Sequence, residues 1–308
     1  MNRRLLEKAS PIRIQGLFGL FPRALGELLA AALPVLLDRR RQAQEGRPNR
    51  QRAVGGGRTR RLAPYQEVLL TLLYLRHNVS HEVVGAFFGV SADTSENTFH
   101  EVIRVLQQVC PSSRWDAEKR WQKGQPSWQP TEKDRLLIDS FETPIRRPSD
   151  EARQRRTYSG KKKRHTLKTQ VVTDAQGEIL EIDAGHRGPK ADIRLYEESG
   201  VDLRYPDAEK TADKGYQNSA HPTLHTPHKK PKGGELTPEQ RDENRRLAQQ
   251  RIYVEHGIRR IKGWPACLSA DRRDEYRLAV GLFATVAQAL PAGRQAVVGL
   301  VQLGRILG

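Results

Sequence analysis

The segment HTLKTQVVTDAQGEILEIDAGH, residues 165–186, decides the fold of the C-terminal half of the chain. It contains two runs rich in apolar and β-branched residues, separated by the sequence DAQG at residues 174–177. Two such runs around a turn that contains glycine predict a β-hairpin. Upstream, RLLIDSFETPI at residues 135–145 is another short apolar run, which we expect to form a strand whose end carries Asp139.

Helices and strands alternate after this hairpin. PKADIRLYEES suits a helix that begins at Pro189, and AEKTADKGY contains a strand that ends at Asp213. LTPEQRDENRRLAQQRIYVEHGIRRIKGW predicts one long helix that starts at Thr237, with Pro238 in its first position. Strands followed by an alternation of strand and helix predict a mixed sheet with helices packed on it. The expected fold class is therefore α/β, of the α+β mixed-sheet kind.

The N-terminal third is predicted to be helical. Residues 20–42 have the leucine spacing of a helix, and residues 43–61 form a basic, glycine-rich linker. Three further helices follow between residues 64 and 109, with serines at capping positions and a glycine turn before the last helix. This outline predicts a helix-turn-helix, although a plain three-helix bundle would have the same apolar core. The side chains presented to the major groove would be Thr94, Glu96, Asn97 and His100.

The composition indicates a polyanionic partner. The chain has 53 Lys and Arg against 36 Asp and Glu, a formal net charge of +17. Such a surplus favours a partner that carries many phosphates, because phosphates neutralised by Lys and Arg release counterions. An acidic membrane surface is the alternative, but no apolar run reaches the roughly 20 residues of a spanning helix, and there is no convincing signal peptide. Two cysteines form neither a disulfide framework nor a zinc pattern, so we expect a cytoplasmic, nucleoid-associated protein without a membrane partner.

Two cationic stretches stand out. Residues 153–168 hold eight Arg or Lys and no acid, which predicts phosphate contacts, although a solvated loop has the same composition. On the long helix, Arg251, Glu255 and Arg259 share one face. Glu255 could be a surface ion-pair partner of these arginines, each pair contributing roughly 0.2–0.5 kcal/mol, or it could be a functional acid.

The motifs DSFETPIRRP, YSGKKKRHTLKTQVVTDAQG, ADKGYQN and RIYVEHGIRRIKGW occur in this order after the helix-turn-helix outline. From about Arg61 to Trp264, the chain resembles bacterial insertion-sequence transposases of the DDE superfamily, in the compact branch related to Harbinger-like enzymes. The resemblance implies an RNase H-like catalytic domain preceded by an all-α helix-turn-helix domain. The expected organisation is an N-terminal helix and linker (1–60), the helix-turn-helix domain (61–115), a linker (116–134), the catalytic domain (135–265) and a C-terminal helix and tail (266–308).

The resemblance also implies the site residues. Asp139, Asp213 and Glu255 would be the catalytic acids and would hold two Mg²⁺ ions, for which Mn²⁺ can substitute. The DNA-binding residues would be Lys161, Lys163, Arg164, His165, Lys168, Arg251, Arg259, Lys262, Thr94 and Asn97, with Lys161 to Lys168 near the cleaved bond. The resemblance also implies three accessory positions. Asp192 would be an accessory polar group, or only a cap or first-turn charge of the following helix. Tyr216 would stack on a flipped or single-stranded base, or be a core residue, and His228 would close a strand and meet phosphate.

The implied function is cut-and-paste transposition. The protein would cleave the ends of an insertion sequence by metal-dependent phosphodiester hydrolysis and join the 3′-hydroxyl to target DNA. It would work on the terminal inverted repeats as a homodimer or larger assembly. One alternative is a catalytically decayed or domesticated homologue that acts as a DNA-binding regulator, and another is a structure-selective nuclease that cuts without joining.

Overall fold

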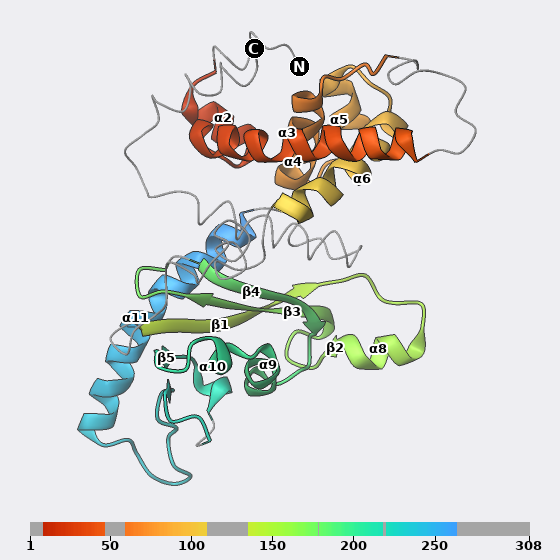
Figure 1. Ribbon diagram of the computed structural model, residues 1–308. Coiled ribbons are helices and arrows are strands. Elements are labelled where there is room, and N and C mark those ends of the chain that lie inside the picture. The colour runs from red at the N-terminus through yellow and green to blue at the C-terminus, as the bar shows by residue number, and fades with distance from the viewer. Residues whose placement is uncertain (1–8, 47–58, 110–134, 178, 218–219, 264–308) are drawn as a thin grey trace. The chain divides into compact units, whose positions relative to one another are not determined.

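The computed structural model describes residues 9–46, 59–109, 135–177, 179–217 and 220–263 (Figure 1). Chain contacts divide the protein into two compact units. The described part of the first unit ends at Val109, and that of the second unit runs from Arg135 to Gly263. The expected linker at 116–134, most of the basic linker and the expected C-terminal segment 266–308 lie outside the described residues.

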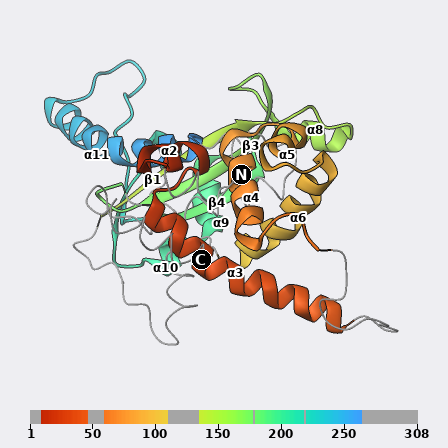
Figure 2. The same cartoon turned by 90° about the horizontal axis from the view of Figure 1, so that it is seen from above.

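Five helices make up the described part of the first unit. They are α2 (Pro11–Phe18), α3 (Pro22–Glu45), α4 (Pro64–His77), α5 (His81–Phe88) and α6 (Ala92–Val109). The predicted N-terminal helix is therefore α3, and it packs against α4 and α6. Figure 2 shows α4 and α6 side by side. Leu25, Leu29 and Leu36 of α3 are fully buried, so this helix forms part of the core of the unit.

The turn between α5 and α6 follows the predicted pattern. Gly89 ends α5 with φ 73°, a left-handed conformation that favours glycine. At the start of α6 the hydroxyl of Ser91 accepts a hydrogen bond from the backbone N–H of Thr94 at 3.2 Å. Ser80 stands at the N-cap position of α5 but makes no capping hydrogen bond to the backbone. The chain thus has the short helix, tight turn and second helix of a helix-turn-helix.

Among the described residues no single helix is long and apolar enough to cross a membrane. Helices α2 and α3 taken together have the length and the apolar composition of a membrane span, but the pair is bent by 53°. The apolar face of α3 is buried within the unit.

The second unit is built on a mixed sheet. Its strands are β1 (Arg135–Pro144), β2 (Tyr158–Ser159), β3 (Arg164–Thr173), β4 (Ile179–Arg187), β5 (Glu209–Thr211) and β6 (Leu224–His225). The order is β2-β3-β1-β5-β6, and β4 also pairs with β3. Strand β3 is antiparallel to β1, β2 and β4, whereas β5 is parallel to β1 and β6. The predicted hairpin is β3–β4, and its turn contains Gly177 at φ 82°.

Helices cover both faces of this sheet (Figure 1). Leu136 and Ile138 of β1 join an apolar cluster with residues of α9 (Asp192–Ser199) and α10 (Val201–Arg204). Residues that alternate with them, such as Asp139, meet α11 (Pro238–Lys262). Because successive strand residues point to opposite faces, α11 lies on the face opposite α9 and α10. The short helix α8 (Glu151–Thr157) packs against β3.

Three predicted boundaries differ from the structure. Strand β1 continues to Pro144 through its pairing with β3, so Asp139 lies inside the strand rather than at its end. Strand β5 ends at Thr211, two residues before Asp213. Helix α9 begins at Asp192 rather than at Pro189, because the chain first turns where the N–H of Lys190 donates to the carbonyl of Arg187 at 3.2 Å.

Candidate active site

The sheet register brings Asp139 and Asp213 together. Leu137 of β1 pairs with Thr211 of β5, and the two strands are parallel. Asp139 and Asp213 each follow this pair by two residues, so they occupy equivalent positions on neighbouring chain segments. Beyond β5 the Asp213 carboxylate accepts a hydrogen bond from the N–H of Gly215 at 2.7 Å and caps a short 3-10 helix, Lys214–Tyr216. This bond fixes the direction of the Asp213 carboxylate.

Asp139 is the most perturbed acid of the site. Burial raises its pKa to about 6, and the negative charges of Asp213 and Glu255 add to the increase. The charge of Arg251 and a hydrogen bond from the N–H of Ser140, at 2.8 Å, oppose the shift without cancelling it. Because Coulomb interactions weaken with distance, the effect of Asp213 and Glu255 on the pKa of Asp139 indicates that both acids lie in its neighbourhood.

Helix α11 presents Glu255 to this site, and the hairpin turn fixes the helix. A Cβ atom added at Gly177 would lie 2.7 Å from the carbonyl oxygen of Tyr253, so the turn and the helix backbone approach as closely as glycine allows. A Cβ atom added at Gly257 would lie 3.3 Å from Thr173 and 3.5 Å from Ile179 on the same hairpin. Arg260 also donates to the carbonyl of Gly177. These contacts hold the exposed Glu255 over the sheet.

Arg251 points into the acid site. It precedes Glu255 by one helical turn, and its Nη2 atom lies 3.4 Å from Oδ2 of Asp139. The Nε atom of Arg251 is buried and has no hydrogen-bond partner in the part of the chain that the structure describes. The side chain therefore compensates the charge of Asp139, but its own hydrogen-bonding capacity is only partly used.

The donor chemistry of the site fits a hard dication. Carboxylate oxygens are the ligands that Mg²⁺ and Mn²⁺ prefer, and Asp139, Asp213 and Glu255 supply them from three separate elements. Across residues 9–46, 59–109 and the described parts of 135–263, no three His, Cys, Asp or Glu side chains stand close enough to hold one ion as they are placed. Arg251 lies against the Asp139 carboxylate, and the three acids are not close enough together in this structure to coordinate one ion.

Ser140 and Asp192 lie beside the acids, and sequence reasoning missed the first of them. The Ser140 hydroxyl donates to Oδ1 of Asp192 at 2.6 Å. A Cβ atom on Gly215 would lie 2.6 Å from Asp192 and 3.0 Å from Asp213, so those two carboxylates flank the same glycine. Asp192 is therefore both a first-turn acid of α9 and a polar neighbour of the site. The signal for Ser140 was its hydroxyl next to Asp139.

The expectation that Lys168 binds DNA near the cleaved bond is wrong. Lys168 is buried, with 7% of its surface exposed. Its ammonium group donates to Oδ1 of Asp192 at 3.0 Å and to the carbonyl of Lys190 at 2.5 Å. A buried charge needs such partners, so Lys168 neutralises Asp192 rather than meeting a phosphate.

The other cations of the 153–168 segment are exposed but distant from the acids. Lys161 and Lys163 lie in the turn before β3, and Arg164 begins that strand. Val171 of β3 pairs with Asp139. At roughly 3.3 Å per strand residue, His165 is about 20 Å along β3 from that pair. The turn therefore cannot touch the phosphate at the acids, but it could meet duplex DNA about six base pairs away. At the start of β3, Nδ1 of His165 lies 3.1 Å from the hydroxyl of Thr157, the last residue of α8.

Two accessory expectations also change. Tyr216 is completely buried in the apolar cluster, so it is a core residue and cannot stack on a base. His228 lies beyond β6, which ends at His225, and does not close a strand. The ring Nε2 atom of His228 lies 2.7 Å from the carboxylate of Glu243, and the backbone N–H of His228 donates to the side-chain oxygen of Asn244 at 2.7 Å. Both partners lie on α11. His228 therefore fastens the preceding loop to the helix.

The remaining candidate DNA contacts are accessible. On α11, Arg259 and Lys262 are exposed, and the Lys262 ammonium lies 5.3 Å from the centre of the Phe141 ring. In the first unit Thr94 and Asn97 are exposed on α6. These positions are open to a ligand, and each lies on a regular helix that fixes its direction.

Comparison with known proteins gives matches to both units. Residues 138–291 match the family model described as DDE superfamily endonuclease, and residues 60–112 match the helix-turn-helix of DDE superfamily endonuclease. The chain is similar to a protein of Microchaete diplosiphon named "Probable transposase for insertion sequence element IS702". Their identity is 34% over 210 residues, which covers 67% of this chain and 72% of the relative. No solved structure matches the chain.

Proposed function

Because the chain belongs to the DDE superfamily of endonucleases, as an insertion-sequence transposase with an N-terminal helix-turn-helix, we propose that it performs cut-and-paste transposition. It cleaves the ends of its element and joins each freed 3′-hydroxyl to target DNA. The observation that supports this most strongly is the register of parallel strands β1 and β5, which aligns Asp139 with Asp213. The catalytic unit would be an RNase H-like fold, which the family implies and with which the mixed sheet agrees.

The three acids would hold the divalent ions that this superfamily uses. We infer that Asp139, Asp213 and Glu255 bind two Mg²⁺ or Mn²⁺ ions. Two such ions activate the attacking oxygen and stabilise the leaving oxygen of a phosphodiester. Because burial keeps the pKa of Asp139 near 6, this carboxyl must lose its proton before it can act as a ligand. Arg251 favours that loss, because its charge lowers the pKa.

Different groups of cations would contact different parts of the DNA. Arg251, Arg259 and Lys262 would contact the strand that enters the acid site, since they lie on the helix that carries Glu255. Lys161, Lys163 and Arg164 would contact the same duplex several base pairs away. Thr94 and Asn97 would read bases of the terminal repeat from the major groove. Pairing of two element ends would need a homodimer or larger assembly, which would act on DNA in the cytoplasm.

One observation favours the alternative of a DNA-binding regulator that no longer cuts. Arg251 lies against Asp139, and within the described residues the acids do not form a ready ligand set. If this arrangement persisted with DNA and metal present, binding would occur without cleavage.

A joining assay separates these functions. A labelled duplex with the terminal repeat is incubated with target plasmid and Mg²⁺, using wild type, Glu255→Gln and Asp242→Asn. Asp242 is a matched control because it is an exposed acid on the same helix, paired with Arg245. Transposition predicts cleavage and joining by wild type and the control but not by Glu255→Gln. Binding without cleavage by all three proteins supports the regulator, and cleavage without joining supports a nuclease.

A further inference from the structure

Helices α3 and α6 enclose a cavity of about 310 Å³ in the first unit. Its lining is dominated by cations, with four arginines and one glutamate. The lining residues are Leu36, Arg39, Arg40, Ala43, Gln44, Arg60, Glu101 and Arg104. We call this cavity the arginine pocket. So many like charges around one hollow are costly unless acids or an external anion compensate them.

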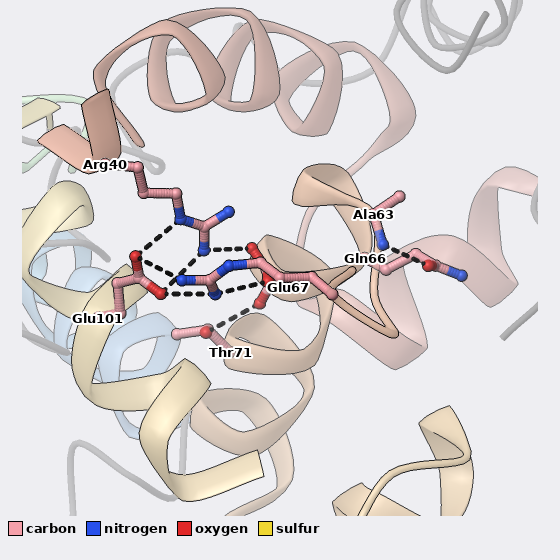
Figure 3. Close-up of polar contacts among 7 residues, drawn as sticks. Arg40, Ala63, Gln66, Glu67, Thr71 and Glu101 are labelled. Atoms are coloured by element: carbon pink, nitrogen blue, oxygen red, sulfur yellow. Dashed lines mark hydrogen bonds and ion pairs between the residues drawn. The ribbon is translucent and has the colours of Figure 1, made fainter. Parts of the chain in front are cut away.

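Two of the arginines are compensated by acids (Figure 3). Arg40 donates to Glu101 at 2.7 and 2.8 Å and to Glu67 at 2.6 Å. Arg60 donates to Glu101 at 2.9 Å and to Glu67 at 3.1 Å. Burial alone would raise the pKa of Glu101, but these two arginines outweigh it and hold the pKa below its usual value. Glu101 is therefore ionised and fully engaged, so it does not neutralise the rest of the pocket.

The other two arginines of the pocket have no acidic partner in the described part of the chain. Arg39 on α3 and Arg104 on α6 are exposed and make no ion pair with any residue that the structure describes. Both line the pocket with Arg60, whose side chain is 52% exposed. A guanidinium group offers donors in a planar fork that matches two oxygens of a phosphate. The pocket thus has the charge and the donor geometry for a phosphate group.

The position of Arg104 on α6 indicates which phosphate group the pocket would bind. Asn97 and Arg104 are separated by two helical turns, so they share the exposed face of the helix. Seven residues of α-helix span about 10 Å, close to the width of the major groove, about 12 Å. If the first turns of α6 enter the groove, its second half reaches the backbone at the groove edge.

We propose that Arg39, Arg60 and Arg104 bind a backbone phosphate of duplex DNA beside the groove that α6 reads. This site rests on the proposed DNA-binding function of the helix-turn-helix. Arg104 is the one Arg or Lys of α6, so Arg39 and Arg60 supply phosphate affinity that this helix does not provide by itself. The Arg40, Glu67 and Glu101 ion pairs hold α3 and α6 at the spacing the site needs.

The test is the salt dependence of DNA binding by the full chain. Fluorescence anisotropy with a mixed-sequence duplex, in chelator to prevent cleavage, compares wild type with Arg39→Gln/Arg104→Gln. Each lost phosphate contact lowers the slope of log affinity against log salt by about 0.9, and the pocket holds one phosphate, so the slope of the double variant should be lower by about 0.9. Arg39→Lys/Arg104→Lys keeps both charges and should keep the slope.

Arg41→Gln is the matched control. Arg41 is an exposed arginine on α3 that pairs with Asp38 and does not line the pocket. It should leave the slope unchanged. The inference is overturned if Arg39→Gln/Arg104→Gln keeps the wild-type slope, or if Arg41→Gln lowers it equally. If wild type itself does not bind the duplex, the proposed DNA-binding function fails instead, which distinguishes the two. Single variants at Arg39 and Arg104 supply the comparison if the double variant does not fold.

Discussion

Arg251 and Asp139 are 112 residues apart in the chain, yet the guanidinium Nη2 atom lies 3.4 Å from the carboxylate Oδ2 atom. Both side chains are largely buried, with 19% and 17% of their surfaces exposed. Burial favours neutral Asp139, whereas Arg251 favours the ionised form. The protonation state of Asp139 therefore depends on its burial in the fold and on the charge of Arg251. It also affects cation binding, because only the ionised carboxylate is a good metal ligand.

Arg251→Gln should raise the pKa of Asp139 further, because the opposing positive charge is lost. Binding of Mn²⁺ to the DNA-free protein, followed by electron paramagnetic resonance across a pH series, should then have a higher midpoint pH than in wild type. Arg259→Gln, which removes an exposed charge from the same helix, should leave the midpoint near the wild-type value. An unchanged or lower midpoint in Arg251→Gln would contradict the inference that the charge of Arg251 lowers the pKa of Asp139.

Asp139→Asn should change the pH dependence of stability. Between the ordinary pKa of 3.8 and about 6, folded wild type keeps a proton that the unfolded chain has lost. This group therefore favours folding below that window, and the contribution is lost as the pH rises through it. The difference between a pKa of 3.8 and a pKa of about 6 corresponds to on the order of 2–3 kcal/mol in the free energy of unfolding.

Urea unfolding at about pH 4 and about pH 7 measures the effect. Asparagine mimics the protonated acid and does not titrate. The free energy of unfolding of the variant minus that of wild type should therefore be larger at about pH 7 than at about pH 4, by on the order of 2–3 kcal/mol. Other titrating groups are common to both proteins and cancel. An equal difference at both pH values would contradict the raised pKa of Asp139.

Gly177→Ala should displace α11. The left-handed conformation costs alanine about 1–2 kcal/mol, and the new methyl group would also meet the Tyr253 carbonyl oxygen at 2.7 Å. We expect a lower melting temperature and slower cleavage of element ends, because Glu255 moves with the helix. Gly160→Ala is the control, since no atom lies within 4 Å of its added Cβ and its φ is not left-handed. Equal melting temperatures for both variants would contradict the close approach.

Arg40→Ala should destabilise the first unit by up to about 3–5 kcal/mol, because it leaves Glu67 buried beside a single remaining arginine. Glu67 is only 2% exposed, and burial raises its pKa. Arg41→Ala breaks an exposed pair on the same helix and should cost less than about 1 kcal/mol. Thermal unfolding followed by circular dichroism compares the two. A similar small cost for both would show that the buried pairs contribute little.

Features set by neighbouring residues could be predicted from the sequence. The hairpin around Gly177, the capping Ser91 and the turn at Gly89 depend on local geometry. The mixed sheet and its covering helices followed from the order of these local patterns. The three acids were found through a family resemblance, and the parallel pairing of β1 with β5 accounts for the proximity of two of them.

Features set by distant residues could not be predicted. Lys168 looked like another cation of a basic stretch until α9 placed Asp192 against it, 24 residues later in the chain. Asp139 looked like a strand end because the apolar run stops near it, but hydrogen bonding with β3 continues to Pro144. The ion pairs of Arg40 likewise join residues from three helices. In each case the deciding contact forms only after the chain has folded.

The rate at which element-end DNA is nicked in Mg²⁺ tests most directly whether the three acids act as one unit. Asp139→Asn, Asp213→Asn and Glu255→Gln are compared with the triple variant, and Asp242→Asn is the control. Residues that act as a unit are non-additive, so each single variant should lose at least about a thousandfold and be as slow as the triple variant. Wild-type nicking by any one of the three single variants would contradict the assignment of that acid.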